Sequence, residues 1–415
     1  MNPQPATSQD ASLPLPNHGE IYRILPDGRW AFWFDNHILS NFTECEQKFL
    51  YNSVRRLRLK GPSRSCISIG QWWSLVSEKF YTRFAEEGPL PIVEMAKIAA
   101  ASWVENNMDS MAKDRPDDYE DFARPTDLTL FTTMLGLQGF ENDLMYAYKA
   151  KAKALRESAA SCAKSESLVD EHAIVALVEE ADRLEKLTTF ALGPILMAVQ
   201  YYAAYAENDF RNWKVIGAEK AFGRENEVLI GTDDSIVVYY MGKPDLVIYD
   251  KPTDQLMPLD QKTKDYVTDK ETISWKPNSQ LCGYVYGLNH IARGLGFDRA
   301  VDRCLVSVCG RKPPAQPRKK GDQPKPRFRR VMPTFSVDEI EEWRRNVMRK
   351  ARRMRQVLEK NDAQRQDGFL CHVYAGCDYR RICSVPEGSR ELMMRSDYVQ
   401  IAPWSPYQKE DESEG

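Results

Sequence analysis

Two short apolar runs separated by a turn-like segment constrain this chain more strongly than any other feature of its sequence. Residues 242–249 and 256–263 each have an apolar, strand-like composition. Residues 250–254 read Asp-Lys-Pro-Thr-Asp, which is the composition of a turn. The pattern predicts a β-hairpin that brings Asp245 and Asp260 side by side.

The predicted hairpin gathers charged side chains that suit metal-assisted hydrolysis. Residues two apart in a strand point to the same face, so Asp260 and Lys262 share one face. Two carboxylates and an ammonium form a site for a divalent cation and a water, and oxygen-only ligands select Mg²⁺ or Mn²⁺. Such a cation polarises a scissile phosphate and lowers the pKa of the water, which the lysine holds or deprotonates. The alternative interpretation is a surface hairpin with a salt bridge.

The order of these residues resembles the core of the PD-(D/E)XK nuclease superfamily, in its RecB-like branch. Gly-Lys-Pro-Asp at 242–245 is followed by a strand, a turn and Asp-Gln-Lys-Thr-Lys at 260–264. Gln280 and Tyr284 then match the Gln-xxx-Tyr motif of that branch and, four apart on a helix, lie on one face. The resemblance implies an α/β (α+β) fold: a restriction-endonuclease-like core with a mixed sheet flanked by helices, plus a large N-terminal helical region.

The resemblance implies further members of the site. Glu219 resembles the acidic residue that precedes the core motifs and helps to bind metal, and the backbone carbonyl of Gln261 is a further candidate ligand. Gly70 begins a segment that resembles a Gly-xx-His helix start whose histidine binds metal in many relatives. Trp73 occupies the histidine position here, and tryptophan cannot bind a metal.

Four of the nine cysteines resemble the ligands of the iron–sulfur branch of the superfamily, seen in CRISPR adaptation nucleases and AddB-like nucleases. Cys45 lies near the start of the region, and Cys371, Cys377 and Cys383 lie near its end at five-residue intervals. Four thiolates suit a [4Fe–4S] cluster. Zinc, bound by four cysteines or by three with His372, is the second candidate. Buried free thiols are the third.

Composition changes along the chain predict its organisation. We expect a flexible leader (1–30), a helical region packed on the core (31–210), the nuclease core (211–310), a basic loop (311–330), a C-terminal strand, helix and cysteine segment (331–395) and an acidic tail (396–415). Within the core, residues 213–263 alternate with the period of strands, which predicts one antiparallel meander holding the site.

The basic loop is the candidate nucleic-acid contact. Its basic side chains would bind phosphates without reading bases; the candidates are Lys312, Arg318, Lys319, Lys320, Lys325 and Arg327. An ordinary solvated loop stiffened by proline is the alternative.

Composition places few limits on the partners. The 415 residues carry a net charge of -3, which neither indicates nor excludes nucleic acid, because a local patch matters more than the total. No run of residues is long and apolar enough for a membrane span, and residues 1–19 lack the pattern of a signal peptide, so we expect a cytoplasmic protein.

These features together predict a Mg²⁺- or Mn²⁺-dependent DNA nuclease. The resemblance to the RecB-like branch implies an exonuclease that acts in recombination, repair or phage DNA metabolism. The sequence carries no Gly-xxxx-Gly-Lys-[Ser/Thr] loop, so a helicase or recombination partner would unwind DNA where that is needed. Two alternatives stay open: a DNA-binding or scaffold protein with a decayed site, favoured by Trp73, and an RNA nuclease.

Overall fold

A computed structural model describes most of the chain. The described residues are 21–60, 65–111, 140–163, 171–186, 192–223, 227–312, 326–366, 368, 371–372 and 376–401. No helix in these ranges has the length and apolar character needed to cross a membrane.

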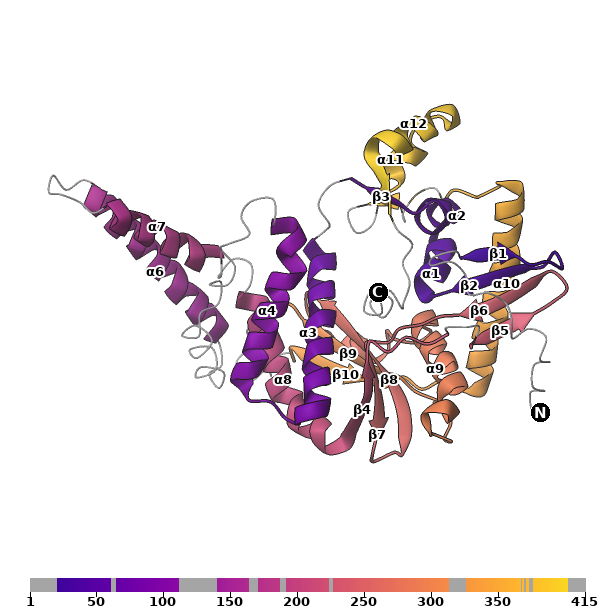
Figure 1. Ribbon diagram of the computed structural model, residues 1–415, viewed down its shortest axis with the longest axis horizontal. Coiled ribbons are helices and arrows are strands. Elements are labelled where there is room, and N and C mark those ends of the chain that lie inside the picture. The colour runs from indigo at the N-terminus through magenta and orange to yellow at the C-terminus, as the bar shows by residue number, and fades with distance from the viewer. Residues whose placement is uncertain are drawn as a thin grey trace.

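A five-stranded mixed sheet forms the centre of the molecule (Figure 1). Its strands, in spatial order, are β10 (Phe328–Val331), β9 (Leu305–Gly310), β8 (Gln255–Lys264), β7 (Leu246–Asp250) and β4 (Trp213–Ala218). β8 and β9 are parallel, and the other neighbours are antiparallel. The predicted turn at 250–254 joins β7 to β8, so the predicted hairpin is confirmed.

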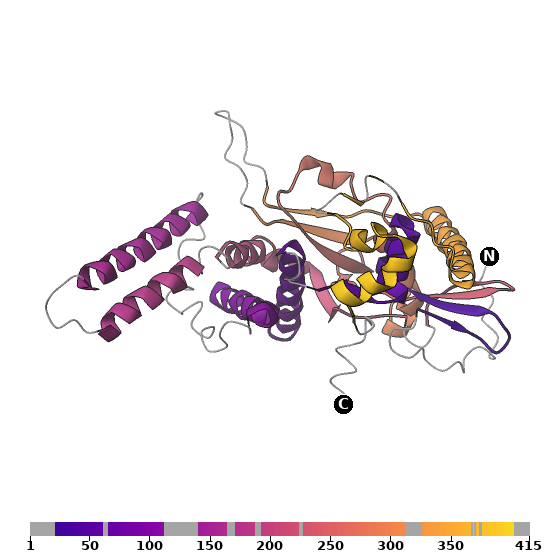
Figure 2. The ribbon, with the colours of Figure 1, turned by 90° about the horizontal axis from the view of Figure 1, so that it is seen from above.

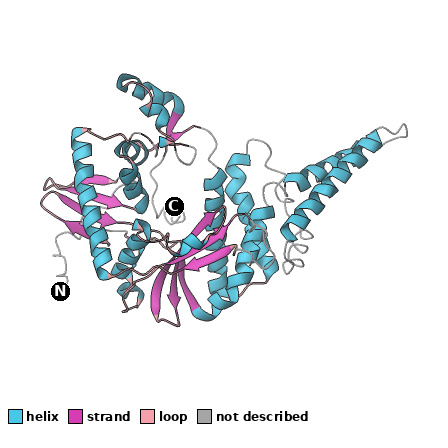
Figure 3. Cartoon of the chain, turned by 180° about the vertical axis from the view of Figure 1, so that it is seen from behind, coloured by secondary structure: helices cyan, strands magenta, loops and turns pink. Residues whose placement is uncertain are grey.

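Helices cover both faces of this sheet (Figure 3). The helices α3 (Ser65–Glu87), α4 (Ile92–Met111) and α8 (Leu192–Asn212) pack on one face, and α9 (Ser279–Ile291) and α10 (Val337–Lys360) lie on the other side. Alternate residues of β8 enter the two cores: Leu259 packs with the first set of helices and Leu256 with the second. Burial on both faces explains the continuous apolar character of these strands.

A second sheet corrects two expectations. β1 (Tyr22–Ile24), β2 (Trp30–Phe34), β6 (Ile236–Tyr240) and β5 (Leu229–Thr232) pair in that order. The expected single meander over 213–263 is therefore wrong, since its middle strands β5 and β6 leave the central sheet, pair with each other, and join β2 through β6. Residues 22–24 and 30 are strand residues rather than leader, because β2 needs β1 and β6 as neighbours for its backbone hydrogen bonds.

The beginning and end of the described chain meet in a small module. It comprises α1 (Asn36–Glu44), α2 (Glu46–Phe49), a π-helical turn η1 (Leu50–Val54), β3 (Leu57–Leu59), α11 (Arg380–Cys383), α12 (Glu387–Asp397) and β11 (Tyr398–Gln400). β3 pairs with β11, so the expected acidic tail does not begin at 396. Residues 402–415 lie outside the described residues.

A two-helix arm projects from the helical side of the molecule (Figure 2). It consists of α6 (Phe140–Ala163) and α7 (Glu171–Lys186). Both helices lie within the expected helical region, 31–210. Two short 3₁₀ turns, η4 (Asp269–Thr272) and η5 (Arg293–Leu295), complete the described elements.

Candidate active site

The β7–β8 hairpin brings the two predicted aspartates together. Its pairing runs from Asp250 opposite Gln255 to Leu246 opposite Leu259. Asp245 and Asp260 occupy the next position of the same register, where directly opposed side chains share a face. The pKa of Asp245 is raised to about 7, first by burial and then by the Asp260 carboxylate. The two carboxylates therefore lie within strong electrostatic reach of each other.

Asp245 is held by the neighbouring strand and by α3. Its Oδ2 accepts a hydrogen bond of 2.5 Å from the backbone N–H of Gln261, and its Oδ1 accepts one of 3.3 Å from Ser74 Oγ. The Gln261 N–H and the Lys262 ammonium act against the rise in the pKa of Asp245. These contacts fix the carboxylate directly before the start of β7.

Asp260 and Lys262 form an ion pair on one face of β8, as the period of two predicts. Lys262 Nζ lies 2.7 Å from Asp260 Oδ2, and only 3 % of the aspartate side chain is exposed against 32 % of the lysine. Burial opposes the charge on Lys262, but the carboxylates of Asp260 and Asp245 outweigh it and raise the pKa of the ammonium. Lys262 is therefore a cation that points from a buried carboxylate toward solvent.

Glu219, at the end of β4, lies beside Asp245. It follows that strand directly, and its backbone N–H donates to the carbonyl of Asp245 at 2.8 Å. Its backbone is left-handed, with φ of 47°, as the chain turns away from the sheet. Its carboxylate lies 2.5 Å from Lys243 Nζ, so an ion pair holds Glu219 beside Asp245.

Gln280 and Tyr284 lie on one face of α9, as predicted, and contact each other. Gln280 Nε2 donates to Tyr284 Oη at 2.9 Å, and Tyr284 Oη donates to the carbonyl of Lys243 at 3.2 Å. The pKa of Tyr284 is raised well above its usual range by burial and then by Asp260 and Asp245. The pair therefore lies close to the acidic residues, and through the Lys243 carbonyl it anchors the segment that leads into Asp245.

Trp73 lies beside the site even though it cannot bind metal. Its side chain is buried in the core under β8, and its indole N–H donates to Gln261 Oε1 at 3.1 Å. Gln261 Nε2 in turn donates to Ser77 Oγ at 3.1 Å. Trp73 therefore stands at the position where many relatives carry the metal-binding histidine, and it holds the side chain of Gln261 in place.

The predicted cysteine ligands approach one another in the terminal module. The pKa of Cys383 is raised to about 11 by burial and then by the thiols of Cys45 and Cys377. The backbone N–H of Cys377 donates to the carbonyl of Cys371 at 3.1 Å. The thiols are thus neighbours in space despite their separation in the sequence.

The basic stretch is only partly described. Arg318, Lys319, Lys320 and Lys325 lie outside the described residues. Lys312 is exposed and lies 3.2 Å from Asp265. Arg327 is 8 % exposed, and its guanidinium donates to Gln200 Oε1 and to the carbonyls of Gly310 and Arg311. The Arg327 guanidinium is therefore buried and hydrogen-bonded within the fold. It is not exposed as the prediction of a nucleic-acid contact requires.

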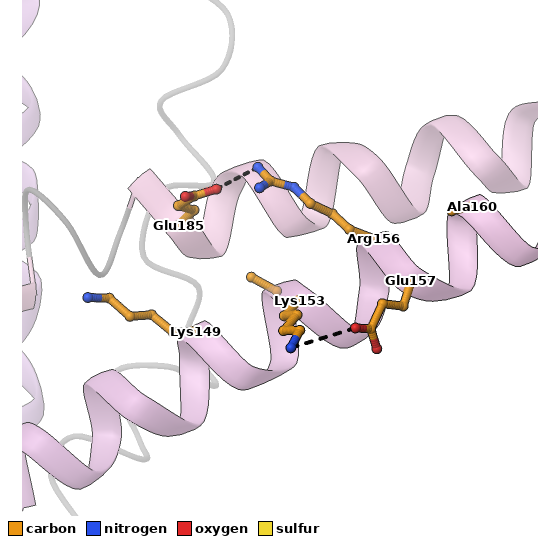
Figure 4. Close-up of a pocket in the computed structure, with 7 residues that line it drawn as sticks. Lys149, Lys153, Arg156, Glu157, Ala160 and Glu185 are labelled. Atoms are coloured by element: carbon orange, nitrogen blue, oxygen red, sulfur yellow. Dashed lines mark ion pairs between the residues drawn. The ribbon is translucent and has the colours of Figure 1, made fainter.

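A depression between the two helices of the arm is lined mostly by charged side chains of α6 and α7, none of them from the β7–β8 hairpin (Figure 4). Its charged side chains pair with each other: Arg156 lies 2.5 Å from Glu185, and Lys153 lies 3.8 Å from Glu157. Lys149 also lines the depression, and each glutamate of its described lining pairs with a cation, so this lining does not resemble the opposed carboxylates Asp245 and Asp260.

The acidic residues of the β7–β8 site offer a buried carboxylate oxygen to a hard cation. Asp260 Oδ2 is buried, and within the described part of the chain no donor points at it along a hydrogen-bonding direction, although Lys262 is close. A buried carboxylate oxygen whose nearby ammonium is poorly aligned, beside a second carboxylate, is a suitable ligand for a cation. Over the described ranges, no three His, Cys, Asp or Glu side chains stand in a ready-made metal-binding group, at this site or among the cysteines.

Sequence reasoning missed three contributors to the site. Ser74 follows Trp73 directly, Lys243 lies two residues before Asp245, and Cys304 is a buried thiol whose pKa is raised by burial and then by Asp260. Lys243 sits inside the segment 242–245 that the sequence had already indicated, and Ser74 directly follows the segment 70–73. Nothing in the sequence marks Cys304, because its proximity arises from pairing of β8 with β9.

Comparison with known proteins agrees with this geometry. A family model described as the PD-(D/E)XK nuclease superfamily matches residues 137–384, more than half of the chain. The match contains β7, β8, α9 and the three C-terminal cysteines of the candidate cluster. A search of curated proteins gives no match. The predicted superfamily and the predicted mixed α/β class are confirmed: the chain belongs to the PD-(D/E)XK nuclease superfamily.

Proposed function

We propose that this protein is a Mg²⁺- or Mn²⁺-dependent DNA nuclease whose active site is the end of the β7–β8 hairpin. The observation that carries the proposal is the opposition of Asp245 and Asp260 across the β7–β8 register, where burial and then the Asp260 carboxylate raise the pKa of Asp245 to about 7 beside the Lys262 ammonium. Two carboxylates that repel each other in a partly buried space favour a divalent cation.

Each residue has a distinct role in this proposal. Asp245 and Asp260 hold the cation, with the Gln261 carbonyl and Glu219 as further ligands. Glu219 would exchange its ion pair with Lys243 for the cation. A bound Mg²⁺ or Mn²⁺ supplies Lewis-acid activation of the phosphate and of a water.

The remaining polar residues act on water and on the strand. Lys262 is protonated beside Asp260, so it orients the attacking water and offsets the charge that develops on the phosphate. Gln280 and Tyr284 anchor the segment before Asp245 and orient the strand to be cleaved.

The order of the motifs also bears on the substrate and the partners. We place the protein with the RecB-like exonucleases, acting on DNA ends in recombination, repair or phage DNA metabolism beside a helicase or recombination partner. The Gln280–Tyr284 pair and the order of the motifs support this branch.

Two competing functions are separated by one assay. Purified protein is incubated with end-labelled single- and double-stranded DNA and RNA, with Mn²⁺ and with chelator. We expect cleavage of DNA that requires Mn²⁺ and is lost in Lys262→Ala while DNA binding is kept. Binding with no cleavage under any metal would support the decayed scaffold, which Trp73 favours. Cleavage of RNA in preference to DNA would support the RNA nuclease.

The cysteine group supports a second proposal, a structural [4Fe–4S] cluster that ties the two ends of the domain together. The proximity of Cys45 and Cys377 to Cys383, whose pKa they raise after burial, supports it. Anaerobically purified protein should be brown and contain about four iron and four sulfide per chain. Colourless protein with zinc would indicate a zinc site, and metal-free protein would indicate free thiols.

A further inference from the structure

A second lysine continues the row of charges on β8. Lys264 lies two residues beyond Lys262 in the same strand, so both side chains leave the same face. Lys264 Nζ lies 2.6 Å from Glu271 Oε2, and 38 % of the lysine side chain is exposed against 3 % of the glutamate. The pair thus repeats the arrangement of Lys262 and Asp260: a buried carboxylate behind an ammonium that faces solvent.

The ammonium of Lys264 is held in place from two directions. Glu271 belongs to η4 and also accepts a hydrogen bond of 3.3 Å from Thr268 Oγ1. Lys264 Nζ lies 4.9 Å from the centre of the Trp275 ring. Trp275 packs in the same core as Tyr284, which places Lys264 on the α9 side of the sheet, as Lys262 is.

The spacing of the two lysines matches a nucleic-acid strand. Residues two apart in a strand are separated by about 7 Å, which is close to the spacing of neighbouring phosphates in an extended strand. Lys264 also ends β8 next to a further basic segment, since the N–H of Arg311 donates to the Lys264 carbonyl at 2.7 Å. Lys262, Lys264 and the segment at Arg311 thus lie in a row that leads away from the carboxylate pair, along which a nucleic-acid backbone could bind.

We propose that Lys264 binds the phosphate adjacent to the scissile one, with Glu271 as the positioning residue that holds its ammonium. This inference rests on the proposed nuclease function and adds a phosphate subsite to it. The subsite takes a phosphodiester of either DNA or RNA. It contributes affinity and register, and it does not touch the reacting phosphate.

A merely structural ion pair between β8 and η4 is the competing explanation, and the variants are chosen to separate the two. Lys264→Met alone leaves Glu271 buried and unpaired, which endangers folding. The double variant Lys264→Met/Glu271→Leu replaces the pair by apolar side chains, so we expect it to keep the fold. Lys264→Arg keeps the charge. Lys97→Met, which removes a lysine that pairs with Glu94 on α4, is the matched control.

The test measures binding of a fluorescein-labelled single-stranded DNA in chelator, over a range of salt concentrations. The double variant should bind several-fold more weakly than wild type, and its slope of log affinity against log salt should fall by about one. Lys264→Arg and Lys97→Met should match wild type. An unchanged affinity and slope in the double variant would overturn the subsite.

Failure of the subsite and failure of the proposed function give different results. Where wild type cleaves DNA with Mn²⁺, the double variant should raise KM and leave kcat nearly unchanged; equal KM values would contradict the inference alone. Where wild type binds DNA but cleaves nothing, the nuclease proposal fails, and a weakened double variant still supports the subsite. Wild-type protein that binds no nucleic acid would contradict both.

Discussion

At the scale of single residues, the candidate site combines charges that the fold only partly compensates. Asp245 and Asp260 repel each other in a largely buried space, and one oxygen of Asp260 lacks a well-aligned donor within the described structure. The Lys262 ammonium offsets part of this charge. Functional sites often keep such strain, because the missing partner arrives with a ligand.

The indole of Trp73 provides a residue-scale prediction with an internal control. Trp73→Phe removes the donor to Gln261 Oε1, and Trp72→Phe removes an equivalent 3.1 Å hydrogen bond from a buried indole to the carbonyl of Ala99. Each change should lower the free energy of unfolding by about 1–3 kcal/mol, as measured by urea denaturation. Only Trp73→Phe should also lower Mn²⁺-dependent cleavage, because only Gln261 adjoins Asp245. Equal activity losses in the two variants would contradict this role of Trp73.

At the scale of elements, the sequence predicts the helices and strands whose formation depends on local patterns. The β7–β8 hairpin, the helix carrying Gln280 and Tyr284, and the long basic helix α10 follow from short-range periodicity and turn composition. The division of the strands into two sheets could not be predicted, because Ile236–Tyr240 pairs in parallel with Trp30–Phe34 across two hundred residues. Alternating apolar and polar residues predict a strand but do not determine which strand it pairs with.

The β5–β6 turn offers a prediction about pH. Burial acts to raise the pKa of Asp233, but hydrogen bonds from Ser235 and Ile236 and an ion pair with Arg352 outweigh it, and the pKa falls to about 2 from 3.8. The folded pKa is below the ordinary one, so the stabilisation is complete above pH 3.8 and is lost as the pH falls toward 2.

Replacement of Asp233 should therefore have a pH-dependent cost. Asp233→Ala should lower the free energy of unfolding by about 1 kcal/mol at pH 7, and the difference from wild type should shrink below pH 4. The exposed neighbour Asp234 is the control, and Asp234→Ala should change stability little at either pH. A cost of Asp233→Ala that stays constant down to pH 3 would contradict the assignment of the carboxylate.

At the scale of the whole molecule, a buried polar network joins the helices to the central sheet. Arg330 of β10 donates to Asp209 of α8 at 2.5 and 2.8 Å, and Tyr81 of α3 donates to the same carboxylate at 2.8 Å. Asp209 is fully buried. The sequence gives no sign of this network, since Arg330 reads as one more cation of a basic loop. The helical region is thus part of the nuclease body.

This network predicts that the helical region and the sheet unfold together. Asp209→Ala should lower the free energy of unfolding by about 3–5 kcal/mol, because it leaves a buried guanidinium without its carboxylate. The double variant Asp209→Leu/Arg330→Met should be less destabilised than Asp209→Ala, since no unpaired charge remains. Urea denaturation followed by tryptophan fluorescence measures both. A double variant less stable than the single one would show that the ion pair itself stabilises the fold.

The central claim is that Asp245 and Asp260 hold one divalent cation between them, and calorimetric titration of Mn²⁺ tests it most directly. Wild type should bind the ion at a site that is lost in Asp245→Asn and equally lost in Asp260→Asn. The double variant should show no further loss, because the two ligands share one site. Mn²⁺ binding that persists unchanged in both single variants would contradict the account.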